Sequence, residues 1–214
     1  MAVTAGDGLA AIFKDLGVSY VVEGGQTMNP STDDIAKAIT KVHAENVYVL
    51  PNNSNIIMAA QQTVDIVDCK VHVIPSKTSP QGIAAMLAYD TDSDADMAEQ
   101  MTESMQDVIT GQITYAVRDS SYDDMEIKEG DIMGMIDGKI SVVGKKVPDV
   151  AKELVKKMVA LNEDAEIITV FKGEDIKDST AGTLHKALEK QYPDFEVDLQ
   201  TGGQPLYYYI ISVE

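Results

Sequence analysis

The first half of the chain alternates short apolar segments with amphipathic helical segments, and this alternation restricts the possible folds more than any other feature. Strand-length apolar segments separated by helices are typical of a parallel sheet with helices packed on its faces. Glycine and proline end several segments, as at Gly17 and Pro51. We therefore expect an α/β unit over residues 1–110, with helix 9–16, strand 18–22, a helix capped by Ser31 or Thr32, strand 46–50, helix 56–67, strand 69–74, helix 80–89 and helix 97–109.

The second half is richer in strands and tight turns. Residues 112–117 alternate in the manner of a strand, and 126–143 contain strand-like segments in which Asp137-Gly138 is a hairpin signal. We expect a β-rich α+β unit over 111–214, with the boundary near Gly111 and no low-complexity linker. Its other elements are predicted at helix 148–161, strand 166–171, helix 179–191, strand 195–199 and strand 207–213.

Acidic residues narrow the range of partners. The 214 residues include 35 acids and 17 bases, a net charge of −18, and the segment 90–131 alone holds 13 acids and two bases. Such a field repels nucleic acids and anionic membranes and favours cationic partners, although acidity can also serve solubility alone. We predict a partner-binding surface whose best candidates are Asp90, Asp92, Asp94, Asp96, Glu99, Glu103, Asp123 and Asp124.

The remaining composition is that of a cytoplasmic protein. A single cysteine, Cys69, excludes an internal disulfide and fits a reducing compartment. No apolar stretch approaches the roughly 20 residues that span a bilayer, and residues 1–7 do not resemble a signal peptide.

No catalytic or metal-binding cluster is evident. The three histidines are dispersed, and neither a nucleophile elbow, nor a P-loop, nor a zinc-protease motif occurs. The segment 6–11 matches a loose dinucleotide fingerprint, with Glu23 near the spacing of a ribose ligand, but only five residues precede it, which is short for a strand. A helix-start turn is the alternative to a nucleotide site.

Three loops after predicted strands could bind a ligand. The carboxyl ends of parallel strands share one sheet edge, where ligands usually bind, and a helix start can receive an anion on its backbone N–H groups. Ordinary turn formation and helix capping is the alternative. The candidate residues are Gly24, Gly25, Gln26, Thr27, Asn29, Asn52, Asn53, Ser76, Lys77 and Thr78. A further Gly-Gly-Gln sequence stands at 202–204.

These loops carry a family resemblance that extends over essentially the whole chain. The segments 22–32 (VEGGQTMNPST), 50–60 (LPNNSNIIMAA) and 74–82 (IPSKTSPQG), with 113–119 and 202–214, resemble the C-terminal region of dihydroxyacetone-kinase-like (YloV-type) proteins. That family includes FakA, the large subunit of bacterial fatty acid kinase. The loop order also resembles that of DegV-type lipid carriers, although Met28 and Asn29 stand where those carriers have a hydroxyl-rich loop.

The resemblance implies two DegV-like halves within a larger kinase. ATP and magnesium would belong to a kinase domain outside this chain, and neither cofactor nor metal is expected here. The implied partners are the other domains of that kinase and a basic DegV-type fatty-acid-binding protein, FakB. Our leading hypothesis is a non-catalytic acidic docking domain for that carrier. The alternatives are a domain that binds or senses a fatty acid or another anion, and a nucleotide-binding enzyme.

Overall fold

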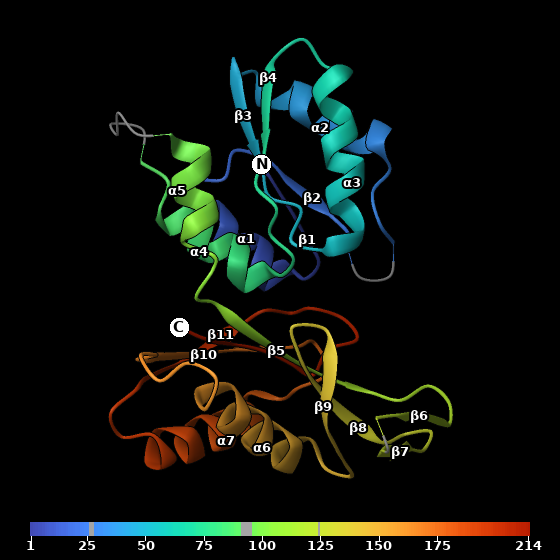
Figure 1. Cartoon of the computed structure of the whole chain (residues 1–214), viewed down its shortest axis with the longest axis vertical. Helices are drawn as coiled ribbons and strands as arrows, with labels where there is room; N and C mark the ends of the chain where they lie inside the picture. Colours follow the sequence, from blue (N-terminus) through green and yellow to red (C-terminus); the bar gives the residue numbers. More distant parts are fainter. Residues whose placement is uncertain (26–27, 91–95, 124) are drawn as a thin grey trace. The chain divides into compact units, whose positions relative to one another are not determined.

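The computed structural model describes residues 1–25, 28–90, 96–123 and 125–214, and it divides into two compact units, Met1–Val108 and Ile109–Glu214. The elements of the first unit, in chain order, are β1 (Ala2–Thr4), α1 (Asp7–Asp15), β2 (Val21–Glu23), α2 (Thr32–Val42), β3 (Asn46–Val49), α3 (Ser54–Gln62), the 3₁₀ turn η1 (Thr63–Asp65), β4 (Lys70–Val73), α4 (Ser79–Leu87) and α5 (Met97–Glu103). Figure 1 shows its helices on both sides of the strands.

The strands of the first unit form a parallel sheet in the order β2-β1-β3-β4. Parallel pairing joins β1 to β2 and β3 to β4, and a parallel bridge from Ala2 to Leu50 joins the two pairs. Val3 N donates to Leu50 O at 2.9 Å in this bridge. The α/β class predicted for this half is therefore confirmed.

Side-chain alternation along these strands builds a core on each face of the sheet. Met1 and Val3 pack with Ile35 of α2 and Ile56 of α3, whereas Ala2, between them, packs into the other core. That second core also holds residues of α1, α4 and α5: Phe13, Ala85, Met97 and Met101. The strands that lead into the candidate ligand loops are therefore packed on both faces of the sheet.

The second unit is a mixed sheet with helices on one face. Its elements are β5 (Ile109–Tyr115), β6 (Ser120–Tyr122), β7 (Met125–Ile127), β8 (Ile132–Ile136), β9 (Lys139–Gly144), α6 (Val147–Val159), β10 (Ile167–Lys172), α7 (Asp178–Gln191), β11 (Glu196–Thr201) and β12 (Tyr209–Val213). The sheet order is β11-β10-β12-β5-β8-β9, in which only β10 and β11 pair in parallel, and β6 and β7 form a separate hairpin.

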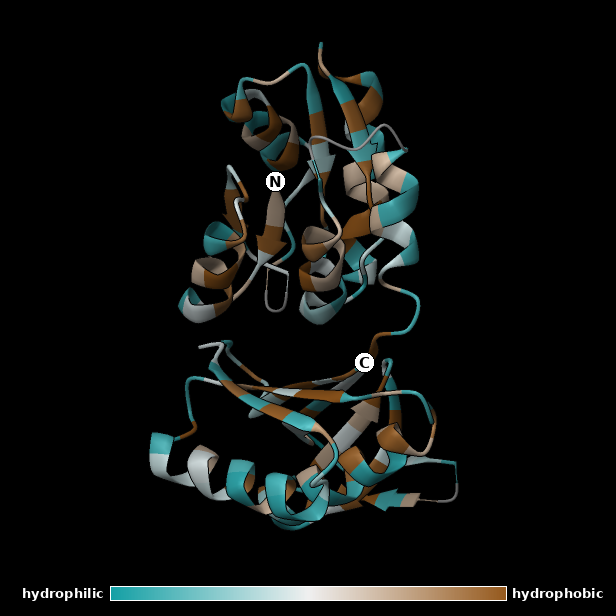
Figure 2. Cartoon of the chain, turned by 90° about the vertical axis from the view of Figure 1, so that its left-hand side faces the viewer, coloured by the Kyte–Doolittle hydropathy of each residue, from teal (hydrophilic) through white to brown (hydrophobic). Residues whose placement is uncertain are grey.

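A single core lies between this sheet and helices α6 and α7. It contains Ile113 and Ile211 from the sheet, Leu154 from α6 and Leu184 from α7. Gly111 allows α6 to approach closely, because a Cβ there would lie 2.5 Å from the sulfur of Met158. In Figure 2 the helices alternate between hydrophilic and hydrophobic along their length, as helices with one buried face do. This is the predicted β-rich unit.

Two local predictions are wrong because tertiary contacts override the sequence pattern. No strand was predicted in the five residues before Gly6, but Ala2–Thr4 is β1 at the centre of the sheet. The helix predicted over 97–109 ends at Glu103, where the Ser104 hydroxyl donates to Met101 O at 3.0 Å, and β5 begins already at Ile109.

The helix predicted over 56–67 and the strand predicted over 18–22 also differ from the structure. Helix α3 spans Ser54–Gln62 and continues as a 3₁₀ turn, in which the Thr63 hydroxyl donates to Ala60 O at 2.6 Å. Strand β2 begins at Val21, later than expected. By contrast, the Asp137-Gly138 turn joins β8 to β9 with φ of 47° and 82°, as its sequence predicts.

Candidate functional site

The candidate ligand loops meet at the carboxyl edge of the first unit's sheet, where Asn52 connects three strands. Its side-chain Nδ2 donates to Val3 O of β1 at 2.9 Å. Its backbone N donates to Ser76 Oγ at 3.0 Å, and that hydroxyl donates to Asn52 Oδ1 at 2.8 Å. Because Asn52 and Ser76 are buried, this arrangement satisfies polar groups that would otherwise be costly to bury.

Asn53 joins the next loop to this edge. Its Nδ2 donates to Gly25 O, and its Oδ1 caps α3 by accepting from Asn55 N at 2.9 Å. Gly24 and Gly25 have φ of 148° and 103°, and a Cβ on Gly24 would lie 2.8 Å from Met28 O. The glycines are therefore required by the backbone conformation of the loop.

The third loop begins helix α4. Thr78 caps α4 by accepting from Gln81 N, and Gln81 Oε1 accepts from Lys77 N at 2.8 Å. Asn29 and Lys77 are exposed, whereas Gln26 and Thr27 lie outside the described residues. The structure thus brings Gly25, Asn52, Asn53 and Ser76 together. Their polar groups bond largely to one another, as expected if these loops only form turns and cap helices.

The predicted acidic surface is best developed on α5. Asp96, Glu99 and Glu103 are spaced by three and four residues, so they follow one face of the helix, and all three are exposed. Asp96 also caps the helix, since its Oδ1 accepts from Ala98 N at 3.0 Å. The other side of α5 buries Met97. We call Asp96, Glu99 and Glu103 the acidic face of α5.

The other predicted acids divide between the two units. Asp90 is exposed in the first unit, and Asp123 is exposed in the second, in the turn between β6 and β7. Asp92, Asp94 and Asp124 lie outside the described residues.

Two mid-chain acids instead support the fold of the second unit. Asp131 is buried and ion-paired with Lys145, and it accepts a hydrogen bond from Lys128 N at 3.0 Å. The Lys145 side chain, followed by the Lys128 amide, lowers the pKa of Asp131. Asp119 accepts from Glu129 N at 2.8 Å and lies 3.4 Å from Lys128 Nζ, and the bond from Glu129 N lowers its pKa. Both acids are neutralised by lysines of the same unit. The sequence alone did not distinguish them from the acids that have no such partner.

The titratable residues that often act in catalysis are spread over the described part of the chain. His43 ends α2, His185 Nε2 lies 2.9 Å from Val197 O, and His72 stacks on Tyr48 with ring centroids 4.8 Å apart. Burial lowers the pKa of His72. Across residues 1–25, 28–90, 96–123 and 125–214, no three histidine, cysteine, aspartate or glutamate side chains are placed to hold a metal ion.

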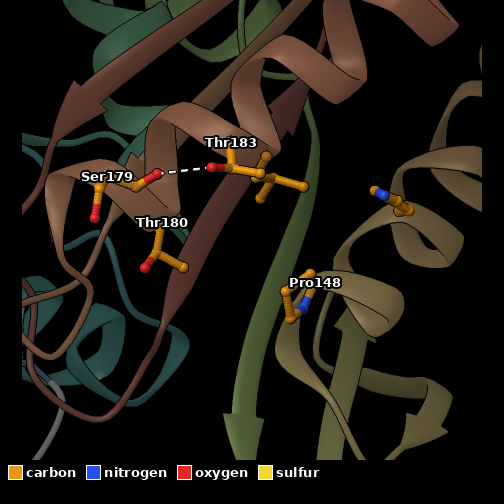
Figure 3. Close-up of a pocket in the computed structure, with 6 residues that line it drawn as sticks. Pro148, Ser179, Thr180 and Thr183 are labelled. Atoms are coloured by element: carbon orange, nitrogen blue, oxygen red, sulfur yellow. Dashed lines mark hydrogen bonds between the residues drawn. The ribbon is translucent and has the colours of Figure 1, made fainter.

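A hollow of about 310 Å³ lies between α6 and α7 of the second unit, and the sequence did not indicate it. Figure 3 shows Pro148 of α6 facing the first turns of α7, where Thr183 Oγ1 donates to Ser179 O at 2.8 Å. Its other lining residues are Lys152, Thr180 and Leu184. Leu184 is buried, whereas the polar residues of the lining are exposed at the surface.

Among the described helices, none combines the length and hydrophobicity needed to cross a membrane.

Solved structures of DegV-type proteins share the fold of this chain. A DegV family protein from Corynebacterium glutamicum aligns with a TM-score of 0.68 at 15% identity, covering 99% of this chain and 94% of that one. The Streptococcus pneumoniae Fak B3 protein, solved with linoleic acid, aligns with a TM-score of 0.62 at 13% identity, covering 86% and 76%. The chain therefore has a DegV-like fold of two α/β subdomains, as the resemblance implied.

The particular family follows from the sequence itself. The family model for the C-terminal region of FakA-like fatty acid kinase proteins matches residues 1–214. Protein YloV of Bacillus subtilis is 46% identical over 213 residues, which are 99% of this chain and 38% of that protein. The chain belongs to the FakA-like C-terminal family, and it spans about 38% of the length of the curated relatives it matches.

Replacing Ser76 by alanine tests the hydrogen bonds at the sheet edge. The variant leaves the buried N–H and Oδ1 of Asn52 without their partner, so we expect a loss of about 1–3 kcal/mol in the free energy of unfolding. Urea denaturation measures this loss, and the exposed Ser54→Ala is the control. Equal stability of the two variants would contradict the structural role of Ser76.

The Asp131 ion pair predicts an acid-dependent loss of stability. The pKa of Asp131 is lower in the folded protein than in the unfolded chain, so its contribution is present above about pH 4 and is lost as the pH falls through the folded-state value. Asp131→Asn should lower the melting temperature at pH 7 and reduce its decline between pH 5 and 3. A decline as steep as in the wild type would contradict this assignment.

Proposed function

We propose that this chain is a non-catalytic docking domain that holds a DegV-type fatty-acid-binding protein for a kinase. The kinase domain of the longer parent protein would use ATP and magnesium to phosphorylate the carboxylate of the carried fatty acid. The carrier would approach with a basic surface, and the complex would form in the cytoplasm. The other domains of the parent kinase would be further partners.

The observation that carries this proposal is a set of exposed carboxylates without ion-pair partners. Within the described residues, Glu99, Glu103 and Asp123 have no salt bridge, whereas Asp119 and Asp131 each pair with a lysine. Carboxylates spaced by one helical turn repel each other. A cationic partner surface would relieve this repulsion and attract the domain over a distance.

The family supports a DegV-type protein as the partner. The chain belongs to a family named for the fatty acid kinase protein FakA, and Fak B3 of S. pneumoniae was solved with linoleic acid. If the fatty acid is presented by a separate carrier, the kinase needs a surface that recognises the carrier. A docking domain would supply a high local concentration of the substrate near the kinase domain.

Neutralising the acidic face of α5 should weaken binding of the carrier. Each exposed ion pair contributes little, so we expect Glu99→Gln with Glu103→Gln to weaken binding several-fold at roughly 0.05 M salt and to have little effect at roughly 0.5 M. Calorimetric titration with the carrier from the same organism measures this change.

The matched control is Glu163→Gln with Glu196→Gln, which removes the same charge from exposed positions elsewhere. If both double variants weakened binding equally, only the net charge would matter, and a specific role of α5 would be wrong. No binding of the wild type at either salt concentration would end the docking proposal.

A second candidate function is binding of a fatty acid by this chain itself. It is favoured by the DegV-like fold, because Fak B3 with the same fold carries linoleic acid. The mutual hydrogen bonds of Asn52 and Ser76 count against it, since they occupy the groups that would bind a carboxylate. Lipid extraction of the purified chain followed by mass spectrometry distinguishes the two. The docking proposal predicts far less than one fatty acid per chain, and a stoichiometric amount would favour the second function.

A further inference from the structure

The loop between β11 and β12 is hydrogen-bonded to the end of β10. Gly202 N and Gly203 N both donate to Lys172 O at 3.0 Å. The Gln204 side chain is fully buried, and its Nε2 donates to Phe171 O at 2.9 Å. A Cβ on Gly202 would lie 1.9 Å from Gln204 Oε1, so the glycine is needed for the glutamine to fold inward.

The same loop holds a leucine in a backbone conformation that leucine disfavours. Tyr207 N donates to Pro205 O at 2.8 Å, and Leu206 between them has φ of 67°. These features define the γ-turn with positive φ, which is the rare and strained type. Thr114 Oγ1 fixes this turn by donating to Leu206 O at 2.8 Å. Glycine would adopt this conformation with less strain, because it has no Cβ.

Burial does not explain why leucine occupies this position. The Leu206 residue is 41% exposed, so much of its apolar side chain contacts water. A strained residue kept at the surface points to a role in binding.

Other exposed apolar residues follow Thr114, whose hydroxyl is bonded to this turn, along the chain. Tyr115 follows Thr114 directly, is 38% exposed, and its ring lies 6.0 Å from that of Tyr208. Val117, two residues further on, is 74% exposed. We call Tyr115, Val117, Leu206 and Tyr208 the Leu206 patch.

An acidic hairpin adjoins the Leu206 patch. Ala116 N donates to Asp131 O and Gly130 N donates to Ala116 O, both at 2.8 Å, so the base of the β6–β7 segment is bonded to the chain between Tyr115 and Val117. Among the described residues, the exposed acids of this segment without an ion pair are Asp123, Glu126 and Glu129, because Asp119 lies beside Lys128. An apolar centre with a charged margin is the usual composition of a protein–protein interface.

We propose that the Leu206 patch is the apolar centre of a docking surface on the second unit, with the β6–β7 acids as its margin. Its occupant is a protein with a hydrophobic recess bordered by lysine or arginine. This inference rests on the docking function and takes the DegV-type carrier as that protein. A second copy of this chain fits poorly, because a two-fold contact through the patch would bring the acidic hairpins of both copies to one interface.

Replacing Leu206 by asparagine separates binding from stability. Asparagine is more often found at a positive φ than leucine but lacks the apolar side chain, so we expect a melting temperature close to that of the wild type, and carrier binding at least about tenfold weaker. The matched control is Leu161→Asn, which removes an exposed leucine of the same unit that lies outside the patch and should leave binding unchanged. Titration calorimetry with the purified DegV-type carrier and sedimentation velocity of the chain alone provide the measurements.

Each outcome decides a different claim. If the wild type binds the carrier and Leu206→Asn binds equally well, the patch is not the docking centre, while the docking function stands. If the wild type binds no carrier, the docking function fails and this inference fails with it. If the wild type self-associates and Leu206→Asn is monomeric, the occupant is a second copy and the proposed partner is wrong.

Discussion

The interaction on which the proposed function depends is the repulsion among carboxylates that the fold leaves unneutralised. Some acids are paired with a lysine: Lys145 neutralises Asp131, and Lys128 lies beside Asp119. On the acidic face of α5, the described residues provide no such partner. A folded chain that compensates some acids and leaves others exposed and close together retains an electrostatic energy that a cationic partner can lower.

At the sheet edge of the first unit, polar residues at the usual place for a ligand site stabilise the fold instead. In open α/β proteins this edge usually binds the ligand, because helix starts and loop hydroxyls meet there. Here Asn52 and Ser76 are bonded to each other, and Asn53 and Thr78 cap helices. The edge residues therefore hold three strands and two helices together. A fold shared with lipid carriers is in this way compatible with the proposed role of recognising a carrier.

Local sequence patterns predicted the layers of the fold. The spacing of apolar residues and the presence of helix-capping residues both determine secondary structure within a few positions of the chain. The Asp137-Gly138 hairpin and the helix capped by Ser31 are of this kind. Strand β1 was missed because three residues carry almost no pattern, and only pairing with β2 and Leu50 makes them a strand. The loops at the sheet edge could be placed in advance, but not the bonds among them.

The remaining features depend on contacts between residues far apart in the chain. Nothing in the sequence distinguishes Asp131 from its exposed neighbours, because Lys145 approaches it only through the β8–β9 hairpin. The strain at Leu206 is equally hidden, since leucine normally indicates the opposite backbone conformation. Charge counting therefore located the acidic region of the chain, but could not separate structural acids from exposed ones.

Hydrogen–deuterium exchange of the domain, alone and saturated with the proposed DegV-type carrier, tests the central claim most directly, because it maps the contact surface without any substitution. Docking through unneutralised carboxylates predicts slower exchange in peptides that cover α5 or the β6–β7 hairpin, and unchanged exchange in β3 and the loop at Asn52. Slower exchange confined to the sheet-edge loops, with α5 and the hairpin unchanged, would contradict it.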